Sequence, residues 1–314
     1  MTQSLTVTSS EALSDHIRMI TLAAPDGAAL PAYAPGAHLD FDLGPLGLRS
    51  YSLVDFTSPA AVPESYRVAV QREAAGAGGS VAMHALAPGD KISVSLPKSD
   101  FELHDDAAPA LLLAGGIGVT PLISFATELS ARGEDFALHY ACRTRELCAF
   151  QGRLTPLLGD RLTCWFDDTA AIDLAALIAA ASPKTHIYCC GPKGMIDAVR
   201  DLAETAGFAK TQIHFELFTA PETQSGDQPF EVEIGDGRVF TVPADQTIVE
   251  VLEEAGVDVM FDCARGDCGI CQTDVLSGTP DHRDVVLSEA ERAAGKVMQI
   301  CVSRAKSARL VLDI

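Results

Sequence analysis

The sequence has few basic residues and no long apolar run. Its 314 residues include 23 Lys and Arg against 43 Asp and Glu, which gives a formal charge of −20 at pH 7. Such a chain can neutralise little of a phosphate backbone, which excludes nucleic acid as a partner. No apolar run approaches the roughly 20 residues that span a bilayer, and the first ten residues lack the basic and apolar segments of a signal peptide. We therefore expect a cytoplasmic protein with no membrane partner.

The chain is too long for one ordinary domain, and its pattern changes twice. Domains of roughly 100–200 residues predict two or three here. Residues 1–104 contain short alternating runs separated by Pro and Gly, which is typical of an antiparallel barrel or sandwich. From residue 107, continuous apolar runs alternate with helical patterns, such as the one over 120–133. This alternation predicts a doubly wound parallel α/β sheet.

A third part follows a predicted linker. The stretch HFELFTAPETQSGDQP, from His214, is polar and turn-forming between Pro221 and Pro229. After it, FEVEIGDGRVFTV predicts a β-hairpin around Asp236 and Gly237, and TIVEVLEEAG predicts a short helix. We place the three domains at 1–104, 105–224 (with the linker) and 225–314.

Nine cysteines in a chain without an export signal indicate thiols or metal ligands rather than disulfides. Four of them, Cys263, Cys268, Cys271 and Cys301, have the Cys-x4-Cys-x2-Cys…Cys spacing of plant-type [2Fe–2S] ferredoxins. Glycines inside the loop would let it fold closely around a cluster, and its amides could then donate hydrogen bonds to sulfur. A structural zinc site is the alternative, although zinc sites prefer two paired knuckles. The remaining cysteines have no ligand spacing, and four of them are expected in the core: Cys142, Cys148, Cys164 and Cys189.

Two further loops have the composition of phosphate-binding sites. GGIGVTP at 115–121 follows an apolar strand and opens a helix, so its backbone amides could bind a diphosphate, and a Cys-Gly-Pro turn at 190–192 strengthens that prediction. RSYS at 49–52, which we place between two strand-like runs, supplies Arg49, whose guanidinium suits a phosphate. GAGGS at 76–80 could bind the same group through Ser80 and two glycine amides. Taken alone, each of these two pieces is a surface arginine or an ordinary loop.

Together these motifs resemble the phthalate dioxygenase reductase family, which includes vanillate O-demethylase reductases. The resemblance covers the full length, and besides the cysteines its matching pieces are RSYS, GGS at 78–80, LLLAGGIGVTP at 111–121, HYACRTR at 139–145, YCCGPKGM at 188–195 and HFELF at 214–218. It implies a multidomain chain: an antiparallel β-barrel that binds FMN, an α/β doubly wound parallel sheet that binds NADH, and a C-terminal α+β ferredoxin domain of the β-grasp type with a [2Fe–2S] cluster.

The resemblance also implies three sets of site residues. For hydride transfer, Ser52 would hydrogen-bond near the flavin N5 and Cys190 would flank the nicotinamide. One departure is Ala77, where relatives often have a basic residue. The implied flavin residues are Arg49, Tyr51, Ser52, Gly78, Gly79, Ser80, Glu216 and Phe218; the NADH residues are Gly115, Gly116, Gly118, Thr120, Pro121, Arg143 (with Arg145 beside it), Cys190 and Gly191; the cluster ligands are Cys263, Cys268, Cys271 and Cys301.

The three modules form an electron-transfer chain. NADH releases two electrons as hydride and a [2Fe–2S] cluster accepts one, so a flavin is needed between them. The resemblance implies an NADH-dependent reductase, monomeric, whose partner is a terminal Rieske-type oxygenase that hydroxylates aromatic rings or O-demethylates. Two alternatives are a freestanding NAD(P)H reductase of a ferredoxin or cytochrome (a diaphorase), and a zinc-stabilised nucleotide-binding regulator. Residues 225–314 contain 8 basic and 17 acidic residues, and this negative charge serves either docking to a basic partner or solubility alone. Arg265 either contacts the partner or offsets cluster charge. The eight histidines receive no role.

Overall fold

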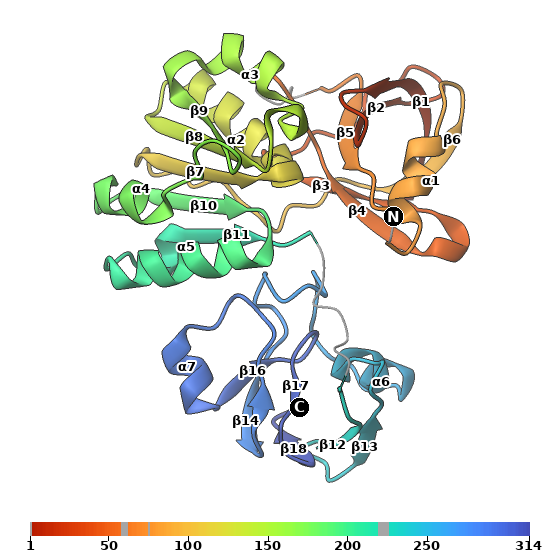
Figure 1. Ribbon diagram of the computed structural model, residues 1–314. Coiled ribbons are helices and arrows are strands. Elements are labelled where there is room, and N and C mark those ends of the chain that lie inside the picture. The colour runs from red at the N-terminus through yellow and green to blue at the C-terminus, as the bar shows by residue number, and fades with distance from the viewer. Residues whose placement is uncertain (1, 58–61, 75, 219–225) are drawn as a thin grey trace. The chain divides into compact units, whose positions relative to one another are not determined.

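The computed structural model describes residues 2–57, 62–74, 76–218 and 226–314. It divides into two compact units, Met1–Glu216 and Leu217–Ile314. The first unit contains two domains and the second unit contains one (Figure 1). Residues 221–225 of the predicted linker, with the predicted boundary at 224/225, lie outside the described residues, so the three domain limits stay predictions.

The first domain is an antiparallel β-barrel, as predicted. Its six strands run in the order β4-β3-β6-β1-β2-β5, and a bridge from Leu53 to Val68 joins the two ends of the sheet. RSYS, which we expected between strands, lies within β4, because its backbone pairs along the whole length of β3. The elements are β1 (Thr2–Ala12), β2 (Ile17–Ala23), β3 (His38–Asp42), η1 (Gly44–Leu46), β4 (Leu48–Ser52), β5 (Tyr66–Gln71), α1 (Gly79–Ala85) and β6 (Lys91–Ser95).

The second domain is the predicted doubly wound parallel sheet. Its strand order, β11-β10-β7-β8-β9, reverses direction between β7 and β10. HFELF, predicted as the start of a linker, instead supplies part of β11, which pairs in parallel with β10. The elements are β7 (Ala110–Gly115), η2 (Gly116–Gly118), α2 (Val119–Arg132), β8 (Phe136–Cys142), η3 (Arg145–Leu147), α3 (Gln151–Leu158), η4 (Gly159–Arg161), β9 (Leu162–Phe166), α4 (Leu174–Ala180), β10 (His186–Cys190), α5 (Lys193–Thr205), η5 (Lys210–Gln212) and β11 (Ile213–Glu216).

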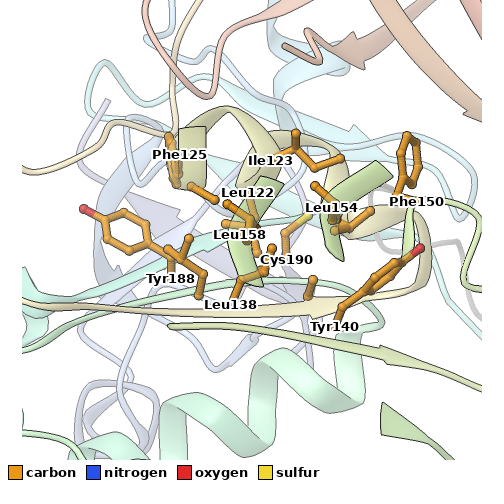
Figure 2. Packing of buried hydrophobic residues seen from close by; sticks show 14 of the residues in the cluster. Leu122, Ile123, Phe125, Leu138, Tyr140, Phe150, Leu154, Leu158, Tyr188 and Cys190 are labelled. Carbon is orange, nitrogen blue, oxygen red and sulfur yellow. The ribbon is translucent and has the colours of Figure 1, made fainter. Parts of the chain in front are cut away.

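Helices α2 and α3 cover one face of this sheet, and their apolar side chains form its largest core. Leu122 and Phe125 of α2 and Leu154 of α3 pack against Leu138 of β8 (Figure 2). Helix α2 ends at Gly133, as predicted, because that residue adopts the left-handed conformation that closes a helix. The buried helix fixes the position of the glycine loop at its N-terminus.

The second unit contains a mixed five-stranded sheet with the order β13-β12-β18-β14-β16. The predicted hairpin is confirmed as β12 and β13, and the predicted helix as α6, where Thr247 and Glu250 form a capping box. This is the expected ferredoxin-type domain. Its elements are β12 (Phe230–Glu233), β13 (Val239–Val242), α6 (Ile248–Glu254), β14 (Gln272–Ser277), β15 (Pro280–Asp281), α7 (Glu289–Ala294), β16 (Val297–Gln299), β17 (Arg304–Ala305) and β18 (Arg309–Leu312).

Among the described residues, no helix is both long enough and apolar enough to cross a membrane.

Candidate functional site

The four predicted cluster cysteines come together in the second unit. The Sγ atoms of Cys271 and Cys301 are 3.0 Å apart, and the thiols of Cys268 and Cys301 both hydrogen-bond with Cys263. These hydrogen bonds strongly lower the pKa of Cys263, whereas the pKa values of Cys268 and Cys301 are raised. The backbone N–H of Arg265 also donates to the Cys263 sulfur, at 3.3 Å. Four neighbouring thiols with an amide donor fit the chemistry of a [2Fe–2S] cluster.

Glycine lets the cluster loop close. Gly266 has φ +82°, and a Cβ built on it would lie 2.6 Å from Val302 Cγ2. Gly269 has φ +78°, with its nearest neighbour, Val286 Cγ1, at 3.4 Å. A side chain at either position would strain the backbone, and at Gly266 it would also overlap a neighbour. The loop is therefore shaped around its glycines, as the sequence predicted.

Across the described residues, no three His, Cys, Asp or Glu side chains are arranged to hold a single metal ion.

Two buried polar residues hold the loop, and the sequence analysis missed both. Asp284 is fully buried and accepts hydrogen bonds from the backbone of Val286 and Leu287, while Val285 N–H donates to Gly266 O at 3.0 Å. Gln299 is also fully buried, with Oε1 3.4 Å from Cys271 Sγ. The contacts of Val285 with Gly266 and of Gln299 with Cys271 join segments distant in the sequence, so no local pattern indicated them.

Arg265 compensates charge within the loop. Its Nε lies 3.6 Å from Asp267 Oδ2, and the same carboxylate oxygen accepts the backbone N–H of Leu217 at 2.7 Å. Burial raises the pKa of Asp267 to about 7, and the charge of Arg265 opposes that rise. Both interpretations of Arg265, docking and the offset of cluster charge, stay predictions.

The predicted nucleotide loops meet at the carboxyl ends of β7 and β10, where the strand order reverses. A Cβ on Gly118 would lie 2.3 Å from the carbonyl oxygen of Cys190, and one on Gly115 would lie 2.6 Å from Pro192 Cδ. Gly116 has φ +56° and open space around it. Ligands of open α/β sheets bind at this reversal point. The close approach thus fits a diphosphate loop at the start of α2.

The other predicted NADH residues divide into buried and exposed ones. Thr120 and Pro121 are buried, and the Thr120 hydroxyl donates to the Ile117 carbonyl at 3.0 Å, so it shapes the loop from within. The Cys190 side chain is also buried in the core of the sheet (Figure 2). Arg143 is exposed after β8, next to Asp167 and Asp168, whose backbone N–H groups donate to this turn.

The predicted flavin-phosphate residues also come together. Arg49, on β4, extends over the turn that begins α1: a Cβ on Gly79 would lie 2.9 Å from its Cγ and Nε. Gly78 has φ +85°, and Ser80 accepts the backbone N–H of Glu73 at 2.9 Å. A guanidinium beside turn amides and a hydroxyl fits a phosphate group.

Of the remaining flavin candidates, Tyr51 is half-buried on β4, and burial raises its pKa to about 12. Ser52 and Glu216 are buried, at the ends of β4 and β11. Phe218 is 40% exposed and belongs to the second unit, whereas Glu216 ends the first. The HFELF motif is therefore divided between the two units.

A stack of rings that the sequence analysis left without a role lies at the other end of the parallel sheet. His104 stacks on His186 with centroids 4.2 Å apart, and His214 stacks on Tyr188 at 4.3 Å. His186 hydrogen-bonds His214 through ring nitrogens 2.9 Å apart, and its other nitrogen lies 3.3 Å from Asp106. Burial lowers the pKa of His214 to about 4. The stack ties the segment between the barrel and β7 to strands β10 and β11.

Comparisons with known proteins assign two of these regions to known domain families. The model of the 2Fe-2S iron-sulfur cluster binding domain matches residues 232–306, and that of the oxidoreductase NAD-binding domain matches 112–201. The chain is 42% identical to a vanillate O-demethylase oxidoreductase of Pseudomonas sp. (strain HR199 / DSM 7063), over 92% of each chain. It is 38% identical to the phthalate dioxygenase reductase of Burkholderia cepacia, over 99% of this chain and 97% of that one. The chain belongs to the phthalate dioxygenase reductase family.

Two solved structures show the same architecture. A phthalate dioxygenase reductase structure superposes with a TM-score of 0.73 at 37% identity, over 100% of this chain and 98% of the other. Full-length CYP116B46 from Tepidiphilus thermophilus superposes with a TM-score of 0.79 at 38% identity, and the present chain spans 42% of that longer protein. The predicted order of flavin, NAD and [2Fe–2S] domains is confirmed. The matched cluster-domain family excludes the zinc-stabilised regulator.

Proposed function

We propose that this protein is the NADH-dependent reductase component of a Rieske-type oxygenase that hydroxylates aromatic rings or O-demethylates. The proposal rests on two sites in one chain. One is the glycine loop at 115–118, which packs closely against Cys190 and Pro192, and the other is the four-cysteine loop, which Gly266 and Gly269 allow to fold. Supporting it, the relatives above are named for vanillate O-demethylase and phthalate dioxygenase, and a 37% identical relative from Acinetobacter pittii is a carnitine monooxygenase reductase subunit.

The flavin we propose is FMN. A mononucleotide ends at one phosphate, and Arg49 with the turn Gly78–Ser80 forms one phosphate site beside Tyr51 and Ser52. When bound, a flavin accepts hydride and passes electrons on singly. Mass spectrometry of the flavin released by denaturation tests this assignment, and FAD as the released species would reject it.

The nucleotide we propose is NADH rather than NADPH. Arg143 lies beside Asp167 and Asp168, and Arg145 is engaged with the ring of Phe166, 4.6 Å away, and with Gln151. The negative charges of Asp167 and Asp168 disfavour a 2′-phosphate near this turn, and Phe166 and Gln151 already engage the Arg145 guanidinium. We expect kcat/KM for NADH to exceed that for NADPH in dye reduction, and an equal or reversed ratio would contradict the assignment.

The four cysteines would hold the [2Fe–2S] cluster, with Gly266 and Gly269 allowing the loop to fold closely around it. The net charge of −9 on 225–314 supports docking to a basic patch on the oxygenase. High salt should then slow reduction of the partner and leave NADH-to-dye turnover unchanged.

The deciding experiment measures NADH oxidation with purified acceptors. We expect fast, substrate-coupled NADH consumption with a Rieske-type terminal oxygenase, and slow reduction of cytochrome c and of a separate ferredoxin. Equal rates with every acceptor would favour a diaphorase. A cytochrome P450 forms the third arm, since an intact type IV self-sufficient cytochrome P450 monooxygenase is among the similar structures. Preferential P450 reduction would reject the Rieske assignment and keep the reductase.

A further inference from the structure

Three cysteines without ligand spacing in the sequence meet in the NAD-binding domain. Cys142 ends β8, Cys148 directly follows η3, and Cys164 lies in the edge strand β9. The Cys148 thiol is 3.9 Å from Cys164 Sγ and also hydrogen-bonds with Cys142. All three are free thiols. Cys148 therefore lies between two sulfur atoms, within reach of either.

The three thiols differ in access to solvent. Cys142 and Cys148 are each 5% exposed and belong to the same buried cluster as the apolar side chains of α3, whereas Cys164 is only partly buried. The parallel register of β8 and β9 sets Cys164 beside Tyr140 and Cys142 beside Phe166. A small solute that approaches the edge strand thus meets Cys164 first, with Cys148 behind it.

The charges around the thiols favour the Cys164 thiolate. Hydrogen bonding with Cys148 lowers the pKa of both Cys164 and Cys142, and the positive charge of Arg145 lowers that of Cys164 further. Arg145 lies on the same edge, its guanidinium 4.6 Å from the ring centre of Phe166. A partly exposed thiolate with a second thiol beside it has the features of a cysteine that peroxides oxidise.

We propose that Cys164 and Cys148 are a dithiol that hydrogen peroxide oxidises to a disulfide. The Cys164 thiolate attacks one peroxide oxygen and the O–O bond breaks, which leaves a sulfenic acid and a hydroxide ion that takes up a proton. The Cys148 sulfur then displaces the sulfenic oxygen as water and forms the S–S bond. Two thiols are oxidised, and one peroxide is reduced to two waters.

The disulfide would move the loop that follows β8. An S–S bond is about 2.05 Å long, so the sulfurs must approach from their present 3.9 Å. Cys148 lies in the same connection as Arg143 and Arg145. This effect rests on the proposed function, in which Arg143 is one of the NADH residues: oxidation should raise the KM for NADH and leave kcat with a dye unchanged.

The test treats the holoprotein with hydrogen peroxide, alkylates the remaining thiols, digests the chain and identifies crosslinked peptides by mass spectrometry. We expect a Cys148–Cys164 crosslink while the visible absorbance of the iron–sulfur cluster persists. In Cys148→Ser, dimedone should label Cys164 as a sulfenic acid. The matched control Cys142→Ser should keep the crosslink, and Cys164→Ser should lose it.

Two results would overturn the proposal: no crosslink in cluster-loaded protein, or a crosslink of Cys148 mainly with Cys142. The wild-type measurement decides this without any variant. A Cys148–Cys164 crosslink with an unchanged KM for NADH supports the dithiol and rejects our placement of Arg143. The thiol chemistry and the NADH assignment can therefore fail separately.

Discussion

Glycines allow close packing at two sites, but in different ways. One site is the cluster loop of the second unit, and the other is the nucleotide edge of the first unit, where the carboxyl ends of β7 and β10 meet. In the cluster loop, three ligands lie within nine residues, and the atom nearest to a Cβ on Gly266 is a side-chain methyl of Val302. At the nucleotide edge, Gly118 approaches the backbone carbonyl of Cys190, which a different strand supplies.

This difference indicates how each site tolerates change. A valine side chain can turn aside at modest cost, whereas the carbonyl of Cys190 belongs to a strand that is hydrogen-bonded on both sides. The cluster loop, a local site whose ligands are close in sequence, should therefore depend mostly on its ligands. The nucleotide edge, a site assembled from separate strands, should depend mostly on its packing.

Removal of a ligand is the strongest test of the local site. Cys268→Ser should abolish the cluster and partner reduction but keep NADH-to-dye activity, because hydride transfer ends at the flavin. Cys164→Ser, the matched thiol of the first unit, should keep the cluster. Visible and EPR spectra with dye assays measure both. Dye reduction lost along with the cluster would contradict this division of labour.

Removal of the flavin-phosphate arginine tests the first unit in the same way. Arg49→Ala should release flavin and abolish dye reduction while the cluster persists, because only the phosphate partner is lost. Flavin content per cluster after gel filtration is the measurement. The exposed Arg72→Ala should keep its flavin, and full retention by Arg49→Ala would refute the phosphate assignment.

Packing at the assembled edge is tested by Gly118→Ala. The Cβ would overlap the Cys190 carbonyl, so we expect a loss of about 1–3 kcal/mol in the free energy of unfolding, and a raised KM for NADH. Gly152→Ala, in α3 with open space around it, should stabilise by about 0.5–1 kcal/mol. Urea unfolding followed by the fluorescence of Trp165, the one tryptophan, compares them. Equal stability of the two variants would contradict the expected cost of packing a side chain at Gly118 against Cys190.

In the cluster loop, Gly266→Ala and Gly269→Ala share the cost of a left-handed alanine, about 1–2 kcal/mol. Gly266→Ala adds the Val302 overlap, so its cluster should be lost faster to a chelator. The double variant Gly266→Ala/Val302→Ala should return to the rate of Gly269→Ala. A rate that stays as fast as in the single variant would show that Val302 is not the cause.

The pH dependence of stability tests the histidine stack of the first unit. Because the pKa of His214 is about 4 in the folded protein and about 6.5 when unfolded, the unfolded chain binds more protons between these values. Stability should be complete above pH 6.5 and fall by about 1–3 kcal/mol as the pH drops towards 4. Trp165 fluorescence in urea series at several pH values measures this, and His214→Phe should reduce the slope. An unchanged slope would place the titration at another group.

Much of the site could be predicted because its residues are close in sequence. The four cysteines, the glycine loop at 115–118 and RSYS with GGS each form a short pattern, and the structure brings the members of each pattern together. The wrong predictions concern strands: RSYS lies in β4 and HFELF in β11, since pairing with β3 and β10 overrides polar local composition.

The sequence by itself determined the three-domain order and predicted which four cysteines meet in the second unit, because ligand spacing and hydrophobic period are properties of neighbouring residues. Only the tertiary structure decided the contacts of Val285 with Gly266 and of Gln299 with Cys271, the contact of Gly118 with Cys190, and the meeting of Cys148 with Cys164. The reason is physical: these contacts depend on strand register and loop closure between distant segments, which many side chains fix jointly and no local pattern records.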